Sequence, residues 1–120
     1  MKTVRIYISG PIAHYDLDER ISTFAQMQDG IETTCRNSGL NVLVVNPFCN
    51  GISQSKPWQE HMRADLKMLL SCDVIYMMHG WEHSKGCKLE LDVASSTGIS
   101  VVVGDTDGLI DKVFYASEQP

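Results

Sequence analysis

Four short apolar runs alternate with longer amphipathic segments along the chain, and this alternation restricts the fold more than any other feature. The apolar runs are rich in Val, Ile and Met and cover residues 4–8, 41–45, 73–78 and 100–103. Apolar residues recur every three or four positions in the segments between and after them, residues 16–38, 58–71, 85–97 and 107–116. The short apolar runs predict strands, and the recurrence of apolar residues every three or four positions predicts helices.

Strands that are apolar throughout and separated by helices form a parallel sheet covered on both faces. We therefore expect an α/β fold with three layers: a doubly wound parallel sheet of four to five strands, flavodoxin-like or Rossmann-like, in one domain over residues 1–120. Ligands of such sheets bind beyond the carboxyl ends of the strands. In this chain those ends carry small and polar residues, at positions 9–12, 46–48, 78–86 and 104–105.

Charge and composition exclude several classes of function. A formal net charge of −5 argues against binding of long nucleic acid, which needs a basic surface. The four cysteines show no C-x-x-C or zinc-finger spacing, and no apolar run reaches the roughly 20 residues of a membrane helix. We expect a cytoplasmic protein with reduced thiols, no membrane contact, no cofactor and no metal, although His79 and His83 stand four apart.

The segment from Ser84 to Glu90 is the strongest indication of a site. It follows the third apolar run and opens a predicted helix, so Ser84, Lys85 and Gly86 lie at a helix N-terminus, where backbone N–H groups bind anions. Glu90 follows within the same helix. A site for a phosphorylated or sugar-bearing ligand is predicted, with Glu90 facing the reactive carbon; the alternative is a solvated surface carboxylate.

Two further residues fit the same chemistry. Asp65 lies at the edge of the apolar stripe of its predicted helix, and its alternative role is a helix salt bridge. Two carboxyl groups suit glycosidic chemistry, one at the anomeric carbon and one delivering a proton to the leaving group. Tyr7, in the first strand, is expected to orient Glu90 by a hydrogen bond, or to be a core aromatic with its hydroxyl satisfied.

The remaining candidates for ligand binding come from the loops at the same edge. The turn Ser9-Gly10-Pro11-Ile12 allows close backbone approach to a ligand. Asn46 ends the second strand, and Trp81 could stack on a base, as could Trp58 from the opposite side. Residues 49–57 form a polar loop of the length that is often functional. The chain has no G-x-G-x-x-G and no Walker loop.

Taken together, these motifs resemble the nucleoside 2-deoxyribosyltransferase superfamily. The matching segments are Tyr7-Ile-Ser-Gly-Pro-Ile12, Arg63-Ala-Asp65, Cys72-Asp73-Val-Ile75 and Ser84-Lys-Gly86 followed by Glu90. The chain is most similar to the short members found in phages and bacteria, and also to 2-deoxynucleoside 5-monophosphate N-glycosidases. The resemblance runs from about Val4 to Val103, although the loop at residues 79–83 is bulkier than expected for the monophosphate hydrolases.

The resemblance implies an enzyme that cleaves or transfers the N-glycosidic bond of a nucleoside or its 5-monophosphate. Glu90 would be the nucleophile, Asp65 the acid and Tyr7 the residue that positions Glu90. Ser84 and Gly86 would contact the 5-end of the sugar, and residues 9–12 would line the part of the site that holds the sugar and base. The resemblance further implies a homodimer or larger homo-oligomer.

Two alternatives stay open from the sequence. One is a non-catalytic protein that binds or sequesters a nucleotide on the same fold, and it needs residues 84–86 but tolerates loss of the Glu90 charge. The other is a small accessory protein that acts through a protein surface, for which neither feature matters.

Overall fold

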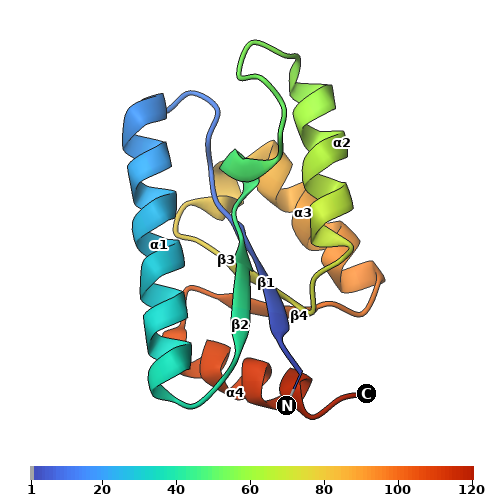
Figure 1. The fold of residues 1–120 in the computed structure, drawn as a ribbon. Coiled ribbons are helices and arrows are strands. Elements are labelled where there is room, and N and C mark those ends of the chain that lie inside the picture. The colour runs from blue at the N-terminus through green and yellow to red at the C-terminus, as the bar shows by residue number, and fades with distance from the viewer. Residues whose placement is uncertain (1) are drawn as a thin grey trace.

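A computed structural model describes residues 2–120, apart from the side chain of Thr106, and has one four-stranded, all-parallel sheet (Figure 1). The strands are β1 (Val4–Ser9), β2 (Val42–Val45), β3 (Val74–Met77) and β4 (Ser100–Val103), in the order β2-β1-β3-β4. The helices are α1 (Leu17–Asn37), α2 (Trp58–Leu69), α3 (Lys85–Ser96) and α4 (Thr106–Ser117). The expected three-layer, doubly wound α/β fold is confirmed.

The helices cover the two faces of the sheet in pairs. One apolar cluster joins alternate sheet residues such as Ile6 and Val74 to Phe24 of α1 and Leu109 of α4. The second cluster joins the opposite sheet face to α2 and α3. This division follows from right-handed crossovers, because the chain moves one way from β1 to β2 and the other way from β2 to β3. In Figure 1 α1 and α2 accordingly lie on opposite sides of the strands.

Local signals account for the helix ends. The side chain of Asp16 caps α1 by accepting a hydrogen bond from the backbone N–H of Glu19 at 3.2 Å, and Ser84 caps α3 in the same way. Gly39, just after α1, has a φ of +76°, the left-handed conformation in which glycine ends helices. The sequence did not predict two short 3₁₀ turns, η1 (Pro47–Cys49) and η2 (Trp81–His83).

The strand order reverses direction between β1 and β3, the two central strands. Residues Ile6 to Ser9 of β1 pair with Val74 to Met77 of β3. Beyond such a reversal the loops diverge to either side and leave a crevice at the carboxyl edge of the sheet. Among the described residues, no helix is long and apolar enough to cross a membrane.

Candidate active site

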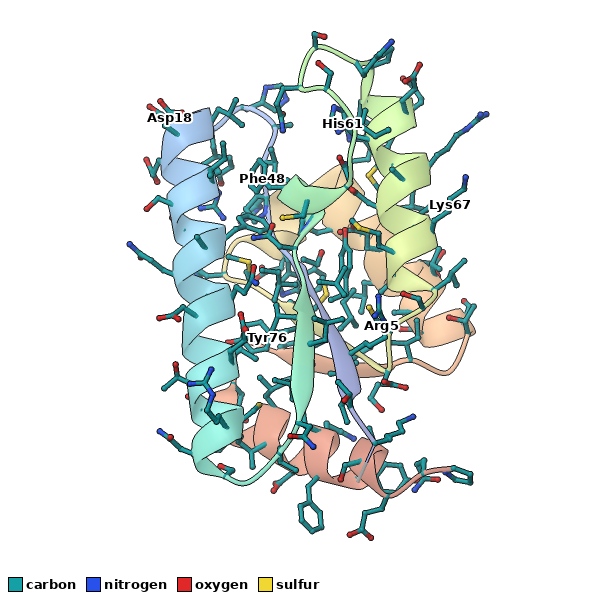
Figure 2. The ribbon with its side chains drawn as sticks, in the orientation of Figure 1. Arg5, Asp18, Phe48, His61, Lys67 and Tyr76 are labelled. Atoms are coloured by element: carbon teal, nitrogen blue, oxygen red, sulfur yellow. The ribbon has the colours of Figure 1, made fainter. Side chains whose placement is uncertain are left out.

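A cavity of about 580 Å³ opens at the carboxyl edge of the sheet, where β1 and β3 end. Its walls come from the loop after β1, from η1 and the following loop, from α2, and from the first turns of α3. Figure 2 shows two of the lining residues, Phe48 and His61, at this end of the molecule. The volume falls in the usual range for small-molecule sites.

Eight of the twelve residues predicted for the site line this cavity. They are Gly10, Pro11, Ile12, Asp65, Ser84, Lys85, Gly86 and Glu90. They come from three segments that are distant in sequence, and the topology of the sheet brings them together. The structure therefore places both candidate carboxylates in the wall of one cavity.

Glu90 is the most constrained carboxylate of the site. It is only 5% exposed. The hydroxyl of Tyr7 donates to Glu90 Oε2 at 2.5 Å, and the hydroxyl of Ser9 donates to Oε1 at 2.6 Å. Both donors lie on the same face of β1, because side chains two apart on a strand point the same way. Tyr7 and Ser9 are fully buried and stand behind Glu90 rather than in the cavity wall.

Burial decides the protonation of Glu90. The pKa of Glu90 is raised to about 7, mainly by burial and to a smaller extent by the charge of Asp65, while the hydrogen bonds from Ser9 and Tyr7 act in the opposite direction. Burial also raises the pKa of Tyr7 well above its usual range, with a smaller contribution from Glu90. Tyr7 is therefore a neutral donor at physiological pH.

Asp65 sits in a different setting on α2. It is 6% exposed, and Asn50 donates to its Oδ1 at 2.8 Å. The pKa of Asp65 is raised to about 6 because burial outweighs the Asn50 hydrogen bond and the nearby His61, which both lower it. The sequence placed Asp65 at the edge of the buried stripe, and the structure buries it.

The N-terminus of α3 forms another part of the wall. Ser84 Oγ accepts from the backbone N–H of Cys87 at 3.2 Å, and the ammonium group of Lys85 lies 4.7 Å from the centre of the Trp58 ring. A side chain at Gly86 would bring a Cβ within 3.3 Å of Met62 Sδ, so glycine lets α3 approach α2 closely here. Positive charge and free backbone N–H groups at a helix start favour an anionic group of a ligand.

Besides Tyr7 and Ser9, two more of the predicted residues, Asn46 and Trp81, lie outside the cavity wall. Asn46 donates from its side-chain amide to Gln28 Oε1 at 3.2 Å and accepts from the backbone N–H of Phe48, so it starts η1. Trp81 is partly buried and packs against the apolar cluster between the sheet, α2 and α3. In contrast, Trp58 does line the cavity.

Several cavity residues were not predicted from the sequence. They are His14, Tyr15, Asn50, Gln54 and, as a ligand-binding residue, His61. The length and polarity of the 49–57 loop were the only sequence features that could have identified Asn50 and Gln54 as cavity residues. His61 lies one turn before Asp65 on α2, so helical spacing from Asp65 was the available signal for it.

His61 is connected to Asp65 through Asn50. Its Nδ1 lies 3.2 Å from Asn50 Nδ2, and its Nε2 is buried without a hydrogen-bond partner among residues 2–120. Within the same residues, no three side chains of His, Cys, Asp or Glu gather in a way that could hold a metal ion.

Comparison with known proteins assigns a family without an activity. No curated protein matches the chain at a significant level. Residues 4–103 match the family described as a domain of unknown function, DUF4406, and this span includes every strand, helices α1 to α3 and the whole cavity wall. The chain therefore belongs to the DUF4406 family.

Proposed function

We propose that the protein cleaves or transfers the N-glycosidic bond of a nucleoside or its 5-monophosphate. The observation that carries the proposal is a buried carboxylate, Glu90, held by two hydroxyl donors in the wall of a cavity that also presents Asp65. The chain's resemblance to the nucleoside 2-deoxyribosyltransferase superfamily rests on the same residues.

The two pKa values define how many protons the pair holds. With values of about 7 for Glu90 and about 6 for Asp65, the pair carries one proton between about pH 6 and pH 7. Two hydroxyl groups donate to Glu90, whereas one amide donates to Asp65. The higher pKa of Glu90 places this proton mostly on Glu90, whereas attack on the sugar needs an ionised Glu90 and a protonated Asp65. We therefore assign the reactive state to the minor form of the singly protonated pair, in which the proton lies on Asp65.

The proposed reaction follows from this assignment. A carboxylate oxygen of Glu90 attacks the anomeric carbon while the bond from that carbon to the base nitrogen breaks and leaves its electron pair on the base. Asp65 gives its proton to the departing base. Water then attacks the glycosyl ester, releases the Glu90 carboxylate and returns a proton to Asp65, which gives a hydrolase. A second base in place of water gives a transferase.

The ends of the cavity suit the two ends of a nucleotide. Lys85 and the first turn of α3 would meet the 5-end of the sugar, and a 5-phosphate would benefit from their positive charge. Aromatic residues Tyr15, Phe48 and Trp58 supply apolar surface for the base. Like the relatives it resembles, the protein is proposed to work as a homodimer or larger homo-oligomer, which sedimentation of the purified chain would establish.

The first experiment is a search for released base. Wild type is incubated with a panel of deoxynucleosides and their 5-monophosphates, and free base is followed by chromatography. Glu90→Ala is the test variant, and Glu82→Ala is a matched control because Glu82 is exposed and lies outside the cavity wall. Base release by wild type and the control but not by Glu90→Ala supports the proposal. Tight nucleotide binding without release by any of the three would favour a nucleotide-binding protein instead.

A further inference from the structure

Asn50 stands at the centre of a hydrogen-bonded group that the proposed reaction has not used. Its side-chain Oδ1 accepts from the backbone N–H of Ile52 at 2.9 Å. A backbone N–H can only donate, so this bond identifies the oxygen of the amide and fixes the direction of Nδ2. The orientation of the Asn50 amide is thereby decided by the chain itself.

Both hydrogens of that amide have defined acceptors. Nδ2 lies 2.8 Å from Asp65 Oδ1 and 3.2 Å from His61 Nδ1. An amide NH₂ group has two hydrogens and no acceptor capacity, so each of these neighbours must accept one hydrogen. All three residues line the cavity, and His61 and Asp65 are one helical turn apart on α2.

Two consequences follow for the protons of the site. If Oδ1 of Asp65 accepts from Asn50, the dissociable proton of Asp65 belongs on Oδ2. If Nδ1 of His61 accepts from Asn50, the neutral imidazole must carry its hydrogen on Nε2. The Nε2–H is then a buried donor that has no hydrogen-bond partner among residues 2–120.

We propose that Asn50 is a positioning residue that fixes the proton of Asp65 on Oδ2 and sets the tautomer of His61. This rests on the proposed function only in calling Asp65 the acid of the reaction. The placement matters because an acid transfers its proton only when the correct oxygen faces the acceptor within hydrogen-bond reach. Asn50 also joins the 49–57 loop to α2 through its hydrogen bond to Asp65.

Three variants separate positioning from mere structural support. Asn50→Asp has nearly the same shape and keeps an oxygen for the Ile52 N–H, but its second oxygen accepts rather than donates. Asn50→Ala removes the group. Ser53→Ala is the matched control, because Ser53 is exposed in the same loop and its hydroxyl contacts only that loop.

The tautomer of His61 is measured by ¹⁵N NMR of the histidine side chains without any substrate, with the His61 signal assigned by its loss in His61→Gln. In the neutral form of His61, wild type and Ser53→Ala are expected to carry the imidazole hydrogen on Nε2. Asn50→Asp is expected to move the hydrogen to Nδ1, and Asn50→Ala to give a mixture. A wild-type His61 with its hydrogen on Nδ1, or a tautomer that is unchanged in Asn50→Asp, would overturn the proposal.

The ionisation of Asp65 supplies a second readout. A ¹³C carboxyl titration of Asn50→Ala is expected to give a higher pKa for Asp65 than in wild type, because the donor to the ionised form is lost. The fall in base release at high pH should shift to higher pH in the same variant, with at least a tenfold lower maximal rate. An unchanged pKa of Asp65 would overturn the proposal. Absence of base release from every variant would refute the enzyme, while the two NMR readouts would still decide the role of Asn50.

Discussion

The hydroxyl of Tyr7 lies 2.5 Å from Glu90 Oε2, although the two residues are 83 positions apart in the chain. Tyr7 is fixed in the central strand β1, where it pairs with Val45 and Ile75 of the neighbouring strands. Glu90 lies on the buried side of α3. A rigid strand therefore sets the direction of the proposed nucleophile, which is the arrangement a preorganised site requires.

Replacing Tyr7 by Phe should lower the rate of base release by about 10- to 100-fold, since a hydrogen bond to a charged group contributes about 1.5–3 kcal/mol. The pKa of Glu90 should rise, because the lost hydroxyl favours its ionised form. Tyr76→Phe is the matched control: Tyr76 lies on the adjacent strand but faces the opposite apolar cluster. Equal rates for the two variants would argue against a role for Tyr7.

Base release should follow a bell-shaped pH profile with its maximum between about pH 6 and pH 7. Below this range both carboxyl groups are protonated and Glu90 cannot attack. Above it both are ionised and no proton is available for the base. Asp65→Asn should lose about 100-fold or more in rate and keep the rise with pH but not the fall. A profile that is flat from pH 5 to pH 8 would contradict the two-carboxyl mechanism.

Glu90 should make the protein less stable as pH rises. Its pKa is 4.5 for an ordinary Glu and about 7 in the folded protein, so the folded state binds more protons than the unfolded state between these values. The free energy of unfolding therefore falls as pH increases through this window, by about 3 kcal/mol in total. This penalty is absent at low pH, where Glu90 is protonated in both states.

Urea denaturation of Glu90→Gln at pH 4.5 and pH 8 tests this expectation. The variant should gain stability relative to wild type at pH 8 and lose most of that gain at pH 4.5. Glu60→Gln, on the exposed side of α2, should show no such pH-dependent difference. A difference between Glu90→Gln and wild type that is the same at both pH values would refute burial as the cause of the raised pKa.

Replacing Gly10 or Gly30 by alanine should change the free energy of unfolding in opposite directions. A Cβ on Gly10 would lie 2.9 Å from Met78 Sδ and 3.1 Å from Phe24 Cζ, so Gly10→Ala should destabilise the fold by about 1–3 kcal/mol. A Cβ on Gly30, exposed within α1, meets nothing within 4 Å, so Gly30→Ala should stabilise the fold by up to about 1 kcal/mol. Thermal unfolding compares the two, and a stabilising Gly10→Ala would show that the loop after β1 does not pack closely on Met78.

Much of the architecture was predictable because it depends on local patterns. The spacing of apolar residues predicted all four strands and all four helices to within two residues at each end, as for residues 16–38 against the observed Leu17–Asn37. Ser84 at the start of α3 was also a local signal, since a hydroxyl residue before a helical stretch caps it. The two 3₁₀ turns were missed because three-residue turns carry little periodicity.

The candidate site was predictable only in part. Residues that follow strands were found, since the carboxyl ends of parallel strands meet at one edge. Asn50 was not predicted because its role lies in hydrogen bonds to Asp65, 15 positions away, and to His61. Both bonds depend on how the 49–57 loop folds onto α2, and through them the side chain of His61 is connected to that of Asp65. Trp81, by contrast, has an aromatic ring that could stack on a base, but this ring packs against the apolar cluster beside α3.

The sequence by itself determined the class of fold, the parallel sheet and the edge at which polar residues collect, because apolar periodicity and chain handedness leave few other arrangements. Tertiary structure alone decided that Tyr7 and Ser9 both reach Glu90, that Asp65 is buried, and that Asn50 joins Asp65 to His61. The physical reason is that hydrogen bonds and desolvation depend on distances of a few ångströms between segments far apart in the chain. Periodicity along the chain fixes which face a side chain takes, but not which partner it meets there.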